Sequence, residues 1–218
     1  MGWIAKFGVA VGFTPTVMFP DLSHINDRMQ TMGLESFPES GIVTYGGGGY
    51  AYLTFIKNLR IGGTGYAGSN TKSATVDGDN LSVEYSTGGG AITLEYTIPT
   101  IKNVAFSVGF MLGGGSTEID IYKSAGTINW DDIWSGQSST GRADHKNMRN
   151  SYYFVSPTIN LDFPLNRFSA LRIGGGYQFT MFNDWEYNNG LSLDGVPENS
   201  HSDMWFIQTG IFVGFFAF

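Results

Sequence analysis

The chain has 218 residues, of which 14% are charged, 15% are aromatic and 31 are glycine, and its net charge is −7. Ordinary globular domains carry about 25% charged residues, so the composition disfavours a soluble fold, and the acidic balance disfavours nucleic acid as a partner. The absence of cysteine excludes disulfides, thiolate nucleophiles and thiolate metal ligands. A transmembrane helix needs about 20 consecutive apolar residues, and glycine or polar residues interrupt every apolar segment of this sequence.

Along the chain, eight segments alternate apolar with small or polar residues at the period of two that a β-strand requires. They cover residues 3–14, 41–55, 59–76, 81–98, 103–122, 151–163, 169–182 and 205–218. The apolar face of each segment suits lipid, and the opposite face suits a crowded barrel interior. In the last segment both faces are apolar, and we expect the face of Trp205, Ile207, Ile211, Val213 and Phe215 to point outward.

The connections between these segments are alternately short and long. Short connections are predicted at residues 56–58, 99–102 and 164–168, and long polar ones at 19–40, 123–150 and 183–203. A hairpin tip at 77–80 joins two segments that exceed the roughly ten residues of a membrane strand, so this hairpin is expected to project from the membrane. Within the first long loop, Asp21 to Gly33 predicts a short helix with Asp21 or Ser23 as its cap. Pro157 interrupts a strand pattern and predicts a bulge.

The terminal aromatic strand, the eight alternating segments and the loop asymmetry resemble the small eight-stranded outer-membrane barrels of the OmpA-transmembrane, OmpX and OmpW type, over the whole chain. The resemblance implies an all-β fold, namely a single-domain (1–218), eight-stranded antiparallel up-and-down transmembrane β-barrel in the bacterial outer membrane, with both termini periplasmic. Met1 is interpreted as an initiator added to a mature chain. The expected surroundings are the lipid bilayer and lipopolysaccharide, without a cofactor. The resemblance also implies a signal for the barrel-assembly machinery at Gly210, Phe212, Phe216 and Phe218.

Five charged side chains fall on inward faces near the predicted periplasmic end: Lys6, Arg60, Glu95, Asp162 and Arg172. An unpaired charge in a low-dielectric interior costs several kcal/mol. We therefore predict a salt-bridge plug in the lumen, built around Glu95 with Arg60 and Arg172. A static plug is favoured, and a gate or proton-linked conduit is the alternative.

Small residues above the predicted plug leave volume on the inner face. They predict a cavity beside Tyr50, Tyr52, Tyr66 and Gln178 that would bind a lipid tail or a small apolar solute. The favoured alternative is that the glycines relieve crowding and permit strand curvature.

The predicted loops carry three histidines, each near an aspartate: His24, His145 and His201, with Asp21, Asp144 and Asp203. Their spacing matches no metal or catalytic motif, so we expect solvated side chains, no metal and no catalytic residue. The aromatic-acidic stretches 128–134 and 184–187 suit a surface ligand or partner protein, or the aromatic girdle of the barrel.

The leading functional hypothesis is non-enzymatic: an envelope-structural barrel that binds a surface ligand or partner protein through its extracellular loops, or admits a small apolar solute through a narrow lumen. A lipid-modifying enzyme with a site at the extracellular rim is the alternative. A third hypothesis is an accessory subunit of a larger envelope complex.

Overall fold

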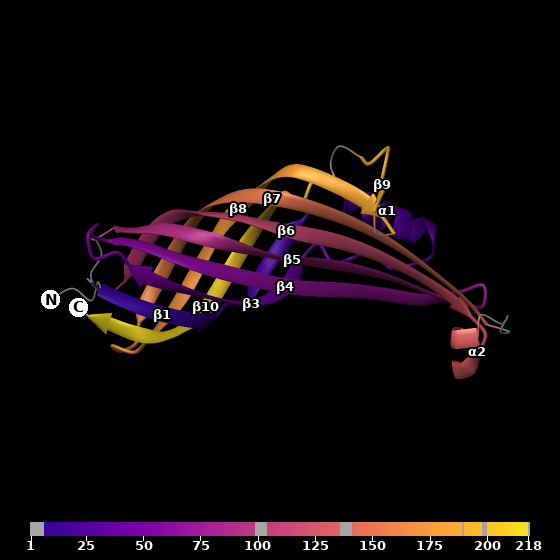
Figure 1. Cartoon of the computed structure of the whole chain (residues 1–218), viewed down its shortest axis with the longest axis horizontal. Helices are drawn as coiled ribbons and strands as arrows, with labels where there is room; N and C mark the ends of the chain where they lie inside the picture. Colours follow the sequence, from indigo (N-terminus) through magenta and orange to yellow (C-terminus); the bar gives the residue numbers. More distant parts are fainter. Residues whose placement is uncertain (1–6, 99–103, 136–140, 189, 198–199, 218) are drawn as a thin grey trace.

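The computed structural model describes residues 7–98, 104–135, 141–188, 190–197 and 200–217. Its strands form one antiparallel sheet that closes on itself, because β10 pairs with β8 on one side and with β1 and β2 on the other (Figure 1). The elements are β1 Phe7–Phe13, β2 Thr16–Pro20, α1 Ser23–Thr31, β3 Ile42–Tyr52, β4 Leu59–Val76, β5 Asp79–Ile98, β6 Ala105–Ala125, α2 Trp130–Ser135, β7 Arg142–Pro164, β8 Ser169–Tyr187, β9 Leu191–Ser192 and β10 Met204–Ala217.

The strands β1 and β2 together occupy one strand position in the barrel wall. They are separated at Pro15, which has no N–H to donate. Two backbone hydrogen bonds continue the ladder across the break, from Thr14 N to Gly46 O (2.9 Å) and from Thr209 N to Pro15 O (3.0 Å). With β9 a short addition to the end of β8, the wall of the barrel has eight strands. The predicted eight-stranded antiparallel barrel is thus confirmed.

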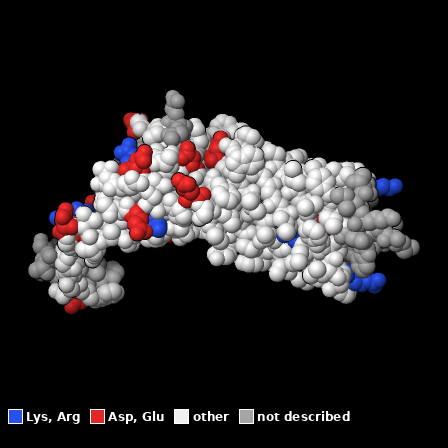
Figure 2. All heavy atoms as spheres, turned by 180° about the vertical axis from the view of Figure 1, so that it is seen from behind, with Lys and Arg blue, Asp and Glu red and all other residues white. Residues whose placement is uncertain are grey.

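The side chains alternate between the two faces of the wall as the sequence pattern predicts. Large apolar side chains are exposed on the outside, including Val11, Phe13, Ile61, Ile92, Leu112, Tyr153, Ile159 and Ile173. Figure 2 shows most of the charged residues gathered over one part of the molecule and a few Lys or Arg residues at the opposite end, with a broad stretch of the barrel surface between them almost free of charge. The barrel therefore carries an apolar outer band of the kind that lipid covers.

The last strand has the orientation expected from the sequence. Trp205, Ile207 and Val213 are more than half exposed on the outside, whereas Phe206 and Phe212 are buried in the lumen. Of the residues assigned to the assembly signal, Phe216 is described in its backbone but not in its side chain, and Phe218 lies outside the described residues.

Four strands continue beyond the rest of the barrel as a flat extension, which we call the projection: residues 68–76 of β4, 79–87 of β5, 117–125 of β6 and 142–150 of β7 (Figure 1). The pairing of β3 with β4 ends at Ala67, so β4 pairs only with β5 from there to the hairpin. The loop predicted at 123–150 is wrong at both ends, because residues 123–125 belong to β6 and residues 142–150 to β7. We call the opposite end of the barrel, where the short connections lie, the turn end.

The projection has its own apolar core, formed where helix α1 packs on its inner face. Ile25 and Met29 of the helix lie in one buried cluster with Val83, Tyr85 and Ile119 of the sheet. The helix is shorter than predicted and has no side-chain cap: the Asp21 carboxylate accepts hydrogen bonds from Ser23 instead. None of the described helices has the length and hydropathy of a membrane-spanning helix.

The bulge predicted at Pro157 is wrong. Pro157 lies opposite Phe110 in a continuous register between β6 and β7. The register shift between β7 and β8 falls at Ser151 and Tyr153, near Phe182 on β8, which has a positive φ of 57°. The irregularity thus lies at the base of the projection rather than within the barrel.

Candidate functional site in the lumen

Four charged side chains meet in the lumen toward the turn end, and all four are at most 5% exposed. Arg60 lies 2.6 Å from a Glu95 oxygen and 2.5 Å from an Asp162 oxygen. Arg172 lies 3.1 Å from Glu95 and 2.6 Å from Asp162. Each carboxylate thus bridges both guanidinium groups, and the two positive and two negative charges balance. We call this group the ion cluster; Lys6, also assigned to the plug from the sequence, lies outside the described residues.

The strand register places these ions opposite one another. Arg60 on β4 is directly opposite Glu95 on β5, and Asp162 on β7 is directly opposite Arg172 on β8. Between the two pairs lies β6, whose residue opposite Glu95 is Gly109. A Cβ atom at Gly109 would lie 2.9 Å from the Glu95 Cα and 3.0 Å from its Cγ. The missing side chain therefore leaves the space through which Glu95 reaches Arg172.

Polar side chains that the sequence reasoning did not single out complete the cluster. The Ser107 hydroxyl accepts a hydrogen bond from Arg60 (2.7 Å), and the Asn160 amide donates to Glu95 (3.3 Å). Neither residue carries a charge that would have flagged it in the sequence. The extra bonds matter because buried ions are stable only when their remaining donors and acceptors are satisfied.

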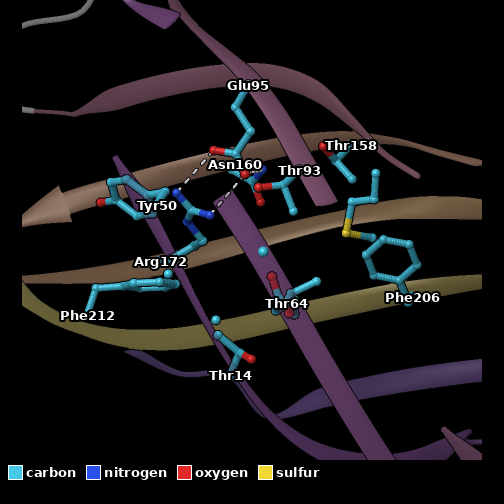
Figure 3. A pocket seen from close by; sticks show the side chains of 15 residues that line it. Thr14, Tyr50, Thr64, Thr93, Glu95, Thr158, Asn160, Arg172, Phe206 and Phe212 are labelled. Carbon is cyan, nitrogen blue, oxygen red and sulfur yellow. Dashed lines mark hydrogen bonds and ion pairs between the residues drawn. The ribbon is translucent and has the colours of Figure 1, made fainter. Parts of the chain in front are cut away.

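Aromatic rings close the other side of the cluster. The Tyr50 ring centroid lies 4.6 Å from the Arg60 guanidinium carbon and 5.0 Å from that of Arg172, and the Phe212 ring lies 4.8 Å from the latter. Cation–π contacts of this kind strengthen when water is excluded. Figure 3 shows Arg172 between these two rings and Glu95. Aromatic rings thus pack directly on both guanidinium groups inside the barrel.

Next to the ion cluster lies a polar cavity of about 20 Å³. The hydroxyls of Thr14 and Thr158 line it and have no hydrogen-bond partner among the described atoms. A cavity needs about 10–15 Å³ of this measure to hold one water molecule. The space is therefore large enough for about one water and too small for a lipid tail or an apolar solute.

The four residues expected to line a ligand cavity lie in different layers of the lumen. Tyr50 borders the polar cavity, and Tyr52 packs with Tyr50 beside Arg60. Tyr66 donates to the Gln178 side chain (3.0 Å), whose amide donates to the Ser202 carbonyl (3.1 Å). Tyr52, Tyr66 and Gln178 do not line the polar cavity, so the four do not share a single space of ligand size there.

Within the described parts of the chain, no group of three or more His, Asp or Glu side chains has the arrangement of a metal site. His145 lies 2.7 Å from Asp120, rather than pairing with its sequence neighbour Asp144, and its ring stacks on Tyr122 with 4.5 Å between the centroids. His201 is exposed. His24 and His201 both line one small cavity beside α1, whereas His145 lies elsewhere on the projection.

One serine and one histidine lie at the distance expected of a nucleophile and its base: His24 Nε2 is 3.1 Å from the Ser200 hydroxyl. The other ring nitrogen of His24 is buried without a hydrogen-bond partner in the described residues, so no third group orients the ring. Burial lowers the pKa of His24. Ser200 is buried beside a cavity of only about 10 Å³, which leaves no room for a substrate.

Comparison with solved structures places the fold. A major outer membrane protein from Thermus thermophilus aligns over 95% of this chain and 99% of that chain, with a TM-score of 0.53 and 8% identity. This is the fold of a small eight-stranded outer-membrane β-barrel. The attachment invasion locus protein Ail of Yersinia pestis, in complex with the heparin analogue sucrose octasulfate, aligns with the barrel over 97% of this chain and 99% of that chain at 9% identity (TM-score 0.46). Neisserial surface protein A aligns over 96% of this chain and 97% of that chain, also at 9% identity (TM-score 0.46).

No family model and no curated protein sequence matches the chain. At identities near 9%, the similarity between these barrels extends to the fold alone. The outer-membrane β-barrel fold indicates the bacterial outer membrane as the location, and the apolar outer band is the surface that meets lipid.

Proposed function

We propose that this outer-membrane β-barrel is a closed, non-enzymatic surface-binding protein, and that its projection binds an extended polypeptide segment along strand β4. In this proposal the turn end, where β1 begins and β10 ends, faces the periplasm together with both termini, and the projection stands outside the cell. Lipopolysaccharide surrounds the apolar band on the outer side. The barrel-assembly machinery remains the expected partner during biogenesis, through the carboxy-terminal strand.

The observation that carries the proposal is the unpaired edge of β4 in the projection. The hairpin closes at Asp77 and Gly78, both with positive φ, as a two-residue turn flanked by the pair Val76 and Asp79. The flanking pair of such a turn is hydrogen-bonded, and bonded and non-bonded pairs alternate along the strands. The backbone N–H and C=O groups of Thr71, Ser73 and Thr75 therefore point away from β5.

No backbone hydrogen bond from another part of the described chain reaches that edge. The three residues are exposed, and their side chains are short and polar. An open edge of this kind is a template to which another chain adds as a strand. Extended over about 3.3 Å per residue, residues 69–76 offer an edge of roughly 25 Å.

The lumen and the rim support solute uptake and catalysis less well than strand addition. Uptake of an apolar solute requires a path through the barrel, whereas the ion cluster and its aromatic neighbours occupy the lumen and the adjoining cavity holds about one water. Catalysis at the rim would need an oriented base and space for a substrate, and the Ser200–His24 pair has neither.

The test is strand addition to purified protein in phospholipid nanodiscs. The probes are ten-residue peptides of alternating Thr, Val and Lys, and the same peptides with every second amide N-methylated. We expect binding of the unmethylated peptides only, loss of binding in Thr71→Pro, and retention in Thr71→Ala, which keeps the N–H group. The proline is compatible with an edge position whose N–H faces solvent. Equal binding of both peptide sets, or an unaffected Thr71→Pro variant, would refute the proposal.

A further inference from the structure

The outermost helix of the projection, α2, carries an exposed apolar face. Trp130, Ile133 and Trp134 are 72%, 60% and 74% exposed. Residues spaced three and four apart lie on the same side of a helix, and the two indole rings are in contact at 5.9 Å between centroids. Figure 1 places α2 at the far end of the projection, away from the barrel. These side chains therefore belong neither to the aromatic girdle nor to the core around α1.

The other aromatic-acidic stretch shows the contrast. Trp185 is partly buried and packs against the cluster of α1 and the projection. Its burial accounts for a large apolar side chain at that position. The same explanation does not apply to Trp130 and Trp134, which keep most of their surface in water. Tryptophan is among the residues that contribute most binding energy when a partner buries it.

The charges around α2 indicate what kind of partner would cover it. Asp131 is exposed, and neither Asp131 nor Asp77 at the nearby hairpin forms an ion pair with a described residue. The two cations at this end of the sheet, Lys123 and Arg142, are both paired with Asp79, at 2.9 and 2.7 Å. The unpaired charge at the end of the projection is therefore negative.

The sign of this charge separates two kinds of partner. Helices that lie on membrane surfaces carry Lys or Arg on their polar face, whereas α2 has Asp131 and Asp132 and no basic residue in its last turn. A short helix with apolar residues at these spacings is also the kind of element that proteins bind in an apolar groove. Complementary charge around such a groove steers the two partners together.

We propose that α2 is a docking site for a protein whose apolar groove is bordered by Lys or Arg side chains, with Trp130 and Trp134 as the anchors. The inference rests on the proposed surface role of the projection, but it concerns a different binding surface from the β4 edge. Binding at α2 is a helix-in-groove contact, and binding at β4 is strand addition.

The test is a selection from a random-peptide display library against the protein in phosphatidylcholine nanodiscs. We expect enriched peptides that combine aromatic or aliphatic residues with a net positive charge. Their affinity should fall at least about tenfold in Trp130→Ala/Trp134→Ala, as for central anchor residues, and fall with added salt. The control Leu191→Ala removes another exposed apolar side chain at the same end of the molecule and should leave the affinity unchanged.

Several outcomes would overturn the proposal. In the selection, the proposal fails if no peptides are enriched over the double variant, or if the enriched peptides are acidic or uncharged. It also fails if the protein binds phosphatidylcholine vesicles or associates with itself, and the double variant loses that binding or association. The Thr71→Pro variant separates the two proposals: it should keep the selected peptides bound at α2 even if strand addition at β4 fails.

Discussion

The ion cluster makes the substitution Glu95→Gln the sharpest test of the lumen. Glu95 touches Arg60 at 2.6 Å and Arg172 at 3.1 Å, and it is 5% exposed. The substitution leaves two buried guanidinium groups with a single carboxylate, so the cluster gains one unbalanced positive charge. At an effective dielectric constant of 20, a pair of charges about 4 Å apart interacts with roughly 4 kcal/mol. Glutamine keeps one acceptor oxygen, and we expect a loss of about 3–5 kcal/mol in the free energy of unfolding.

The assay is equilibrium unfolding by urea in phospholipid vesicles, followed by tryptophan fluorescence. The matched control is Glu84→Gln on the same strand, whose side chain lies on the outer face of the projection and forms no ion pair with a described residue; it should change stability by less than about 0.5 kcal/mol. The double variant Glu95→Gln/Arg172→Gln removes one charge of each sign. It should therefore lose less stability than the sum of its single variants.

A sealed, paired lumen is refuted if Glu95→Gln costs no more than Glu84→Gln. It is also refuted if the double variant shows simple additivity, because the two side chains would then not be coupled. Either result would mean that water solvates the cluster and that the lumen is open to it.

Three further comparisons between variants or between pH values test the packing of the barrel and the docking of α1. Gly109→Ala should destabilise the barrel by about 1–3 kcal/mol through overpacking, since its Cβ would lie 2.3 Å from the Leu94 carbonyl, whereas Gly63→Ala, with 3.6 Å to its nearest neighbour, should be close to neutral in the same unfolding assay. Phe212→Ala should cost about 3–5 kcal/mol and Phe215→Ala much less, because the first ring is buried in the lumen and the second is about half exposed on the outside; similar costs would invert the assigned faces. Burial lowers the pKa of His24 from 6.5, so the docking of α1 is fully stabilised above about that pH and weakens as the pH falls. The protection factors of the α1 amides, which correct for the intrinsic exchange rate at each pH, should fall from pH 7.5 to pH 5 in the native chain but not in His24→Gln.

The ion cluster could be predicted from the sequence as far as local pattern reaches. Period-two alternation places Arg60, Glu95, Asp162 and Arg172 on inward faces, and the short distance of each from a short connection places all four at the same end. The sequence does not show which carboxylate meets which cation across the lumen. That depends on the curvature of the closed barrel and on the space at Gly109, which are tertiary properties.

The length of the projection was harder to predict, for a physical reason. A membrane strand is recognised by an apolar outer face, and this signal ends where lipid gives way to water. In β6 and β7 the outer face of the projection carries Glu118, Asp120 and Arg149, so the alternation there is between polar and mixed residues and resembles a loop. Helix α1 was recognisable because its apolar spacing is its own and does not depend on the surrounding solvent.

The ion cluster in the lumen and the core of the projection involve the same strands. Arg60, Glu95 and Asp162 lie on β4, β5 and β7, the strands that extend into the projection. Cross-linking these strands by buried ion pairs within the barrel fixes their relative positions at the base, and the α1 core fixes them again further out. A partner that adds to the β4 edge then meets a surface that is already ordered, which lowers the entropic cost of binding. In the proposed function, the contacts that occupy the lumen thereby also favour binding at the outer end of the barrel.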